Sequence, residues 1–445
     1  GHPLRIAAQI EDLTRLGRPG ATAEGKVDLD WGATQLAIAG ELPLGAGLKG
    51  YAVKADLKSA SFNDMLAYLD VRQGRTAAAN AHFEAREWQG LTEITGLAAT
   101  LGGFKFGGDA KFSRTGPKTV VKGHFEGERL VWERFLLDLG YPPVPGLEPD
   151  ELFRDVPLAW PLLVSLQGSA GAFDLKLKSL MLRNGVELRN AKSSLVFDGD
   201  RLDLKPFGAE TLGGSASGTL AFEGRKKLVR VDFDGTNLLL ERWFRERGSP
   251  IPFKGGPMKI KAVFTATGDS LKDLAATVTG PITVRMGPGV WTSEKAGHAE
   301  SVMTSAFSAT GAGSIDFECM SASLPFSNGR AASQSILGAR STASQILTSG
   351  SIDLRDESLD LRGRVQPRSG RVGLATIAGN ILITGNIRHP KTSLDPVGTP
   401  GAIARAGVAI ATAGLSLVGT ALADAEQWKK NDACEAVFSE TARRR

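Results

Sequence analysis

Apolar and polar residues alternate one by one over much of this 445-residue chain. The alternation is clear in Phe173-Asp-Leu-Lys-Leu177 and Val229-Arg-Val-Asp-Phe233, and it recurs in Leu359-Asp-Leu361. Successive side chains of a β-strand point to opposite faces of the sheet, so a period of two predicts strands with one apolar and one solvated face. A chain patterned in this way is mainly β.

Turn residues separate these strands at short intervals. Glycine is abundant, with 54 residues, whereas aromatic residues make up only 7% of the chain. Asp198-Gly199 stands between two alternating runs, which is a strong signal for a β-hairpin. Strands joined by short hairpins run antiparallel. The expected fold is therefore an elongated, curved antiparallel sheet, a repeating β-groove, with a few short helices.

Helices are expected where the alternation gives way. Residues 62–69, 130–139 and 238–244 are amphipathic and each follows a strand, which suggests duplicated strand-plus-helix modules. Residues 406–423 carry no charge and predict a C-terminal apolar helix about 27 Å long. Its Ala and Gly content suits packing on protein or lying at a membrane interface, and a membrane-spanning role remains an alternative. The Ser, Ala and Gly of residues 294–345 predict a mixture of loops, short helices and short strands.

Two proline-rich segments, 140–146 and 249–257, are expected to be loops between modules, because consecutive prolines interrupt strand pairing. They divide the chain into an N-terminal β-groove region (residues 1–146), a middle β module (147–256), a C-terminal β module (257–398) and a helical tail (399–445).

Residue groups that could perform catalysis are not found in the sequence. The five histidines have no metal-binding spacing, and no Cys or acidic residue lies at a ligand offset from them. The run Gly213-Gly-Ser-Ala-Ser217 lacks the closing glycine of a nucleophile elbow. We therefore expect no enzymatic activity, no cofactor and no metal. The net charge of +5 comes without a basic face interleaved with aromatic residues, which argues against nucleic-acid binding.

The only two cysteines, Cys319 and Cys434, are compatible with one disulfide in an oxidising compartment or with two reduced thiols. A bridge would tie the tail to the last sheet module, and it requires the two Cα atoms to lie within about 7 Å of each other.

The apolar face of so many strands must be covered. One solution is a two-layer sandwich, in which the face is ordinary core, and composition alone favours it. The other is a curved sheet whose concave apolar face is a groove for acyl chains. In the groove alternative, the residues that point into one concavity are Leu202, Leu204, Leu220, Phe222, Val229, Val231, Phe233, Ile260, Phe264, Val278, Ile282 and Val284. Their neighbours, which should then face water, are Asp203, Arg230, Asp232, Lys259, Lys261 and Arg285.

Several strand segments follow one another along the second half of the chain. They are Leu195-Val-Phe-Asp-Gly-Asp-Arg-Leu-Asp-Leu204, Leu212-Gly-Gly-Ser-Ala-Ser-Gly218, Phe317-Glu-Cys-Met-Ser-Ala322, Gly350-Ser-Ile-Asp-Leu354 and Ile383-Thr-Gly-Asn-Ile-Arg-His-Pro390. This series resembles the C-terminal region of the AsmA-like family. The resemblance covers residues 195–434, and the first 190 residues share only the strand pattern.

The resemblance implies a non-enzymatic protein of the Gram-negative cell envelope, anchored in the inner membrane by an N-terminal helix and projecting into the periplasm. Its β-groove would bind and transfer phospholipid acyl chains. The anchor is missing from this sequence, and the chain is short for a bridge across the periplasm. Membrane contact would come through that anchor or through residues 406–423. The alternative is a scaffold for outer-membrane protein biogenesis, with envelope proteins as partners and the apolar face as ordinary core.

Overall fold

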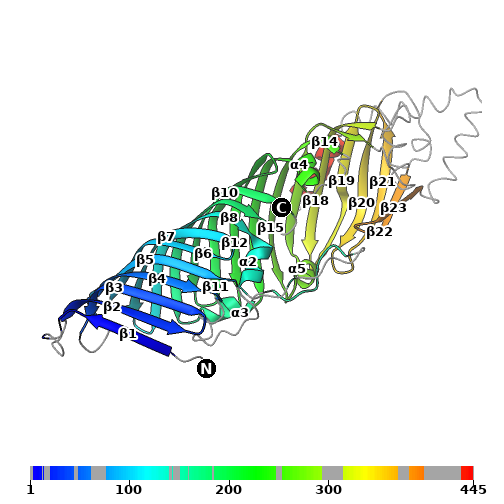
Figure 1. Cartoon of the computed structure of the whole chain (residues 1–445). Coiled ribbons are helices and arrows are strands. Elements are labelled where there is room, and N and C mark those ends of the chain that lie inside the picture. Colours follow the sequence, from blue (N-terminus) through cyan, green and yellow to red (C-terminus); the bar gives the residue numbers. More distant parts are fainter. Residues whose placement is uncertain are drawn as a thin grey trace, which may run out of the picture. The chain divides into compact units, whose positions relative to one another are not determined.

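The structure is a computed structural model that describes residues 4–12, 14, 21–44, 49–61, 77–139, 143, 151–158, 160–182, 185–246, 253–292, 314–368, 380–394 and 432–443. These residues form 23 strands and a few short helices, which confirms the predicted mainly β, curved antiparallel fold (Figure 1). The predicted alternation is visible in the solvent exposure of single strands. Strand β2 (Thr22–Trp31), for example, alternates between half-buried and exposed residues.

The chain forms two compact units. Unit 1 contains residues 1–145, 159–211 and 219–225, and unit 2 contains residues 146–158, 212–218 and 226–445. Strand β12 (Gly214–Glu223) is divided between them. The proline-rich loops predicted boundaries near residues 146 and 256. The chain instead passes from unit 1 to unit 2 between residues 211 and 226, within the predicted middle module.

The sheet of unit 1 consists of β1 (Leu4–Ile10), β2, β3 (Thr34–Pro43), β4 (Ala52–Ser59), β5 (Ala79–Trp88), β6 (Leu91–Leu101), β7 (Phe104–Thr115), β8 (Lys118–Val131), β9 (Ser169–Met181), β10 (Glu187–Asp198) and β11 (Arg201–Thr211). Each strand pairs antiparallel with the next. The exception is the parallel pair β8–β9. Between these two strands the chain returns through helices α2 (Trp132–Asp138) and α3 (Trp160–Ser165), as a parallel pair requires.

Two sequence expectations are confirmed in unit 1. Helix α2 lies within the predicted helical segment 130–139. The hairpin predicted at Asp198-Gly199 joins β10 to β11, with Asp198 paired to Arg201. Gly199 has a φ of 60°, a conformation that glycine adopts without steric cost.

The strands of unit 2 are β13 (Leu228–Leu239), β14 (Phe253–Gly255), β15 (Pro257–Thr267), β16 (Gly280–Met286), β17 (Gly289–Thr292), β18 (Ser314–Ser327), β19 (Arg330–Ser341), β20 (Ser344–Asp353), β21 (Ser358–Pro367), β22 (Asn380–Asn386) and β23 (Pro390–Leu394). They pair antiparallel in the order β13-β15-β16-β18-β19-β20-β21-β22-β23. The short strands β14 and β17 pair with each other, and β17 also pairs with the start of β18. The described residues of this unit also form helices α4 (Leu240–Glu246), α5 (Leu271–Thr277) and α10 (Ala433–Arg443).

Residues 314–345 correct the expectation of loops and short elements, because they form β18, β19 and the start of β20. The physical reason lies in what covers these strands. A Cβ atom added to Gly338 would lie only 2.2 Å from the backbone oxygen of Ala433 in α10, so the helix packs directly on the strand. A side chain would not fit at Gly338, so glycine is required at this position despite its low β propensity. Likewise, Phe253–Gly255, expected within a loop, form strand β14.

The remaining helix predictions have different outcomes. Helix α4 confirms the helix expected at 238–244. The helices expected at 62–69 and 406–423 lie outside the described residues. None of the helices in the described part of the chain is long and apolar enough to span a membrane.

The interior of unit 2 is closely packed. One cluster of buried apolar residues is built around Phe253, Phe317 and Ile381, and Leu240 of α4 packs against it. A second cluster includes Ile336 and Leu361, and Leu274 of α5 packs against it. Short helices therefore contribute directly to covering the apolar side of this sheet.

Candidate apolar groove

Strand register places the apolar residues of unit 1 on one face of its sheet. Leu29 of β2 pairs with Leu36 of β3, and Leu36 pairs with Leu57 of β4. Further along, Phe125 of β8 pairs with Leu175 of β9. Directly paired residues on neighbouring strands lie on the same face. The apolar side chains therefore form a surface that runs from strand to strand across unit 1.

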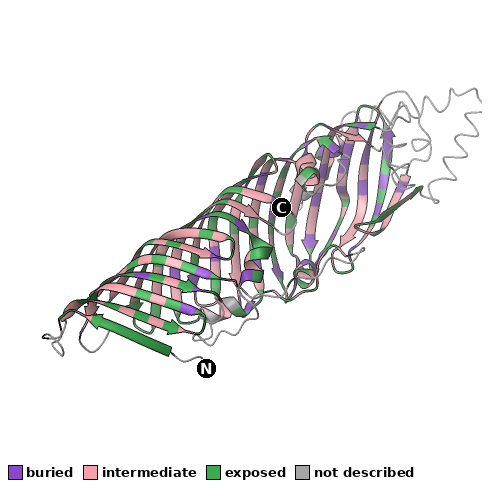
Figure 2. Ribbon diagram, in the orientation of Figure 1, coloured by how far each residue is buried: buried purple, intermediate pink, exposed green. Residues whose placement is uncertain are grey.

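Much of this surface is only half-buried, although Leu101 and Phe197 on the same face are buried, at 6% and 8% exposure. Leu29, Leu36, Leu57, Phe125 and Leu175 are all of intermediate exposure. On β1, Leu4 and Ile6 are exposed, at 51% and 63%. Among the described residues, the most completely buried large apolar side chains are all in unit 2: Phe253, Ile336, Leu361, Ile381 and Val437, each at 1% or less. Figure 2 shows the same contrast, with buried residues concentrated on strands such as β18 to β21.

Aromatic rings line part of the apolar face of unit 1. The ring centroids of Phe125 on β8 and Phe173 on β9 are 5.1 Å apart. Phe173 and Phe197 on β10 are stacked at 6.1 Å. Gly171 lies directly beside Phe197, where an added Cβ atom would come within 2.3 Å of the ring. The glycine thus leaves room for the Phe197 ring, which a side chain at this position would displace.

Four of the predicted groove residues belong to unit 1. Leu202 and Leu204 on β11 pair with Phe197 and Leu195 on β10, so they lie on the same apolar face. Leu220 and Phe222 on β12 are also half-buried.

The other eight predicted groove residues belong to unit 2, where Val231 pairs with Phe264, and Ile260 with Val284. These apolar residues therefore alternate with polar neighbours along their strands, as expected from the sequence. Val278, however, caps the C-terminal end of helix α5 and lies inside a buried cluster, with Phe264 and Ile282 packed against it. Val229 is buried too, whereas Val231, Phe233, Ile260 and Val284 are half-buried. In unit 2 these residues belong to or border a packed interior.

The neighbours expected to face water do so with one exception. Arg230, Asp232, Lys259, Lys261 and Arg285 are exposed.

Asp203 is the exception and corrects the prediction, because it is buried at 8% exposure. Arg201 and Lys205, two residues away on either side, cover it with ion pairs of 3.1 and 3.3 Å. Burial alone would raise the pKa of Asp203, but the hydrogen bonds and charges of Arg201 and Lys205 outweigh it, and the pKa lies below its ordinary value.

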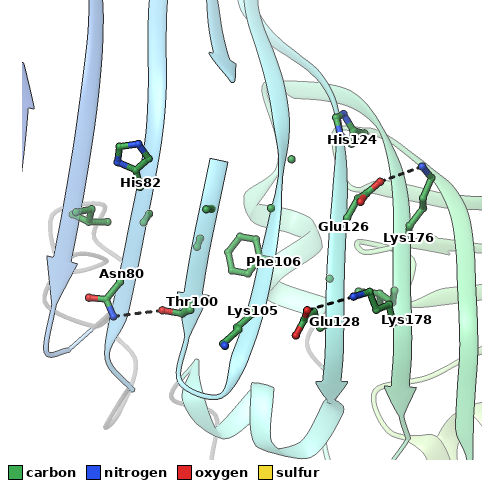
Figure 3. A pocket seen from close by; sticks show the side chains of 18 of the residues that line it. Asn80, His82, Thr100, Lys105, Phe106, His124, Glu126, Glu128, Lys176 and Lys178 are labelled. Carbon is green, nitrogen blue, oxygen red and sulfur yellow. Dashed lines mark hydrogen bonds and ion pairs between the residues drawn. The ribbon is translucent and has the colours of Figure 1, made fainter. Parts of the chain in front are cut away.

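A hollow of about 810 Å³ lies along strands β4 to β10 of unit 1 (Figure 3). Small or apolar residues such as Ala81, Ala99 and Phe106 alternate along its lining with polar ones. The polar side chains are largely paired across strands: Lys176 with Glu126 at 3.2 Å, Lys178 with Glu128 at 3.4 Å, and His82 with Asp56 at 2.8 Å. These pairs are exposed, and each joins a nitrogen of one side chain to a carboxylate oxygen of another, as on a solvated sheet face.

The two cysteines form a disulfide in unit 2. The S–S distance between Cys319 and Cys434 is 2.00 Å, and their Cα atoms are 6.5 Å apart, which meets the condition set from the sequence. The bond joins α10 to β18. Asp432 lies beside the two sulfurs, and these three residues make up the one group of potential metal ligands found in the described part of the chain. Both sulfurs are taken up by the disulfide.

No protein-family model, curated protein or solved structure matches this chain. Its function is therefore inferred from the half-buried face of unit 1 and the sheet that carries it.

Several apolar residues of this face in unit 1 were not predicted from the sequence. Leu36, Phe125 and Phe173 were not among the groove candidates, which were all placed after residue 200. The signal was nevertheless present, since Phe173-Asp-Leu-Lys-Leu177 shows the same alternation as β13. The alternation does not show whether the apolar face of unit 1 or that of unit 2 is closely packed.

Proposed function

We propose that unit 1 binds lipid acyl chains along its apolar face, and that the protein is a non-enzymatic lipid-binding or lipid-transfer protein of the cell envelope. The observation that carries this proposal is the half-buried apolar surface aligned by register across the strands of unit 1. Apolar surface in contact with water is unfavourable, and large contiguous patches commonly mark binding sites. Acyl chains are apolar, long and flexible, so they can cover a surface of this kind.

The energetics favour such a ligand. Each methylene removed from water contributes about 0.8 kcal/mol, so a chain lying across a few strands gains several kcal/mol without any polar contact. Binding of this kind depends on apolar area, so we expect it to tolerate phospholipids with different headgroups.

The disulfide supports an extracytoplasmic location. Structural disulfides such as Cys319–Cys434 persist in oxidising compartments, which include the periplasm. With the resemblance of the strand series to the AsmA-like family, the disulfide supports our proposal that the protein is located in the periplasm, associated with the inner membrane of a Gram-negative cell.

A scaffold for envelope protein assembly is the second candidate. The packed clusters around Phe253 and Ile336 favour it, because in unit 2 the apolar side of the sheet forms a core. If unit 1 is covered in the same way in the cell, its partners are envelope proteins and no lipid is carried.

Two adjacent residues on β3 separate these candidates. Leu36 is half-buried on the apolar face between Leu29 and Leu57. Ala37 is exposed on the other face and pairs with Asp28 and Asp56, so a lysine there meets two carboxylates. Leu36→Lys should therefore reduce lipid binding, and Ala37→Lys should not.

The measurement is phospholipid bound per folded molecule, by native mass spectrometry, with folding checked by circular dichroism. We expect Leu36→Lys to lower the bound lipid several-fold and Ala37→Lys to leave it unchanged. Normal loading of a folded Leu36→Lys protein would contradict the groove. A wild-type protein that never retains lipid would favour the scaffold.

A further inference from the structure

Three potential metal ligands meet at the start of α10 in unit 2. The sulfur atoms of Cys319 and Cys434 and a carboxylate oxygen of Asp432 all lie within 4.8 Å of one another. Cys319 belongs to β18, whereas Asp432 directly precedes α10 and Cys434 is the second residue of that helix. The two cysteines are 115 residues apart in sequence, so spacing alone does not reveal the group. The packing of α10 on the sheet brings it together.

Helix α10 is held on the sheet by contacts other than the disulfide. Ala433 and Val437 are buried, at 0% and 1% exposure. Arg285 of β16 pairs with Glu435 at 2.7 Å, and its guanidinium carbon lies 3.9 Å from the ring centroid of Phe438. We therefore expect α10, and with it the three ligand atoms, to stay in place when the disulfide is reduced.

The charges beside the two sulfurs cancel while the disulfide is closed. Arg340 pairs with Asp432 and, at 2.8 Å, with Glu318, which also pairs with Arg368 at 2.9 Å. Two cations and two carboxylates are thus joined in one network. Opening the disulfide to two thiolates adds two negative charges, and Cys434 is buried at 4% exposure. Buried charge is costly unless it is compensated, and a divalent cation supplies that compensation.

We propose that Cys319, Cys434 and Asp432 bind a Zn²⁺ ion after reduction of the disulfide. Thiolates select soft or borderline cations, and Zn²⁺ accepts sulfur and carboxylate ligands together. Three protein ligands leave the fourth tetrahedral position to water, which can reach the site because Cys319 and Asp432 are only half-buried. The site lies within unit 2 and does not depend on lipid binding by unit 1.

The geometry requires only a local change. Two sulfurs bound to one tetrahedral Zn²⁺ at about 2.3 Å are roughly 1.8 Å farther apart than in the disulfide, and rotation about the Cα–Cβ bonds can supply this. Asp432 is already oriented, because its carboxylate accepts a hydrogen bond from the backbone N–H of Cys434 at 2.9 Å and pairs with Arg340. Carboxylates that bind metals are commonly held by such hydrogen bonds.

Two chemical steps form the site. A dithiol reductant gives two electrons and two protons to the disulfide, so each sulfur becomes a thiol and the reductant becomes a disulfide. Zn²⁺ then displaces one proton from each thiol, and binding releases two protons to solvent. Cys434 lies in the first turn of α10, where the helix dipole favours the negative charge of a thiolate. The disulfide and the metal are therefore alternative links between β18 and α10.

The test uses Co²⁺ as a spectroscopic substitute for Zn²⁺. The whole chain is reduced with a dithiol in the absence of oxygen, separated from the reductant and titrated with Co²⁺, and Zn²⁺ is then added in competition. Circular dichroism shows whether the reduced protein stays folded. We expect one Co²⁺ per reduced chain, with thiolate-to-cobalt charge-transfer absorption and the strong visible bands of tetrahedral Co²⁺. The oxidised protein should show neither.

Asp432→Asn keeps both cysteines and removes the charged oxygen ligand. We expect this variant, once reduced, to bind Co²⁺ and Zn²⁺ at least about tenfold more weakly than wild type. The matched control is Asp316→Asn, which changes an exposed carboxylate of β18 outside the group and should bind like wild type. If Asp432→Asn does not fold, Zn²⁺ should still raise the melting temperature of reduced wild type and leave that of oxidised wild type unchanged.

A folded, reduced wild-type protein that binds no Co²⁺ would overturn the proposal. Binding by reduced, folded Asp432→Asn at the wild-type affinity would overturn it too. The same absorption bands from the oxidised protein would also contradict it, because they would come from other ligands.

Discussion

Single side chains determine how each face of these sheets meets water, and Asp203 is the clearest case. It was expected to face solvent, yet Arg201 and Lys205 cover it and hold its pKa below the ordinary value. A group with a depressed pKa contributes stability above its unfolded pKa, and this contribution is lost as the pH falls through its folded pKa. Asp203→Asn should thus lower the urea midpoint at neutral pH, and its deficit should shrink below about pH 4. Asp232→Asn, at an exposed position, should give no such trend; a constant deficit for Asp203→Asn would contradict this explanation.

Glu357 is a buried carboxylate of unit 2, and its partners are backbone N–H groups. It is buried at 4% exposure, and its carboxylate accepts hydrogen bonds from the backbone N–H groups of Leu152 and Phe153, at 2.5 and 3.0 Å. Glu357→Ala leaves both donors without that acceptor, and we expect a loss of about 1–3 kcal/mol in unfolding free energy. Hydrogen exchange should accelerate at Leu152 and Phe153. The exposed control Glu84→Ala should change neither quantity; unchanged exchange in Glu357→Ala would show that the two bonds do not hold the segment.

At the scale of the element, α10 shows what local pattern cannot supply. The alternation predicted most strands, and Asp198-Gly199 predicted its hairpin. The Ser- and Ala-rich strands β18 to β20 were missed, because a local pattern does not show that helix α10, almost a hundred residues away in sequence, packs directly on Gly338. The presence of two cysteines was compatible with a disulfide and with two reduced thiols, and the sequence did not distinguish between them. Only the fold brings Cys319 and Cys434 together.

The disulfide should make α10 a stabilising element of unit 2. It closes a separation of 115 residues, and ion pairs of Arg285 with Glu435 and of Arg340 with Asp432 support the same contact. We expect Cys434→Ser to cost about 2–4 kcal/mol, because the unfolded chain is no longer constrained by the bond. Thermal unfolding with and without a dithiol reductant measures this. Reductant should lower the melting temperature of wild type and leave that of Cys434→Ser unchanged; an insensitive wild type would contradict the assignment.

Across the whole molecule, strands with the same alternation of apolar and polar residues differ in how far their apolar side is buried. In unit 2 the apolar side is closely packed, with Leu240 and Leu274 supplied by short helices, whereas in unit 1 much of it stays half-buried. Periodicity reports that a face is apolar. It does not report what covers that face, because the covering contacts come from segments distant in sequence. For this reason the sequence predicted the mainly β class but left the sandwich and the groove as alternatives.

This difference predicts opposite effects of similar substitutions. Val231 pairs with Phe264, which packs against the buried cluster of unit 2. Val231→Asp should therefore destabilise the protein, by on the order of 3 kcal/mol. Leu36→Lys, on the half-buried face of unit 1, should leave the urea midpoint nearly unchanged. If the two variants unfold equally easily, the two apolar faces do not differ as the structure indicates.

The central claim is that acyl chains bind to the apolar face of unit 1. The most direct measurement is photo-crosslinking with a phospholipid that carries a diazirine in its acyl chain, followed by mass-spectrometric mapping of the labelled residues. We expect labels on the apolar face, at residues such as Leu36, Leu57, Phe125 and Leu175, and few on the packed clusters of unit 2. Labels confined to unit 2, or labels on the polar and apolar faces of unit 1 alike, would contradict the claim.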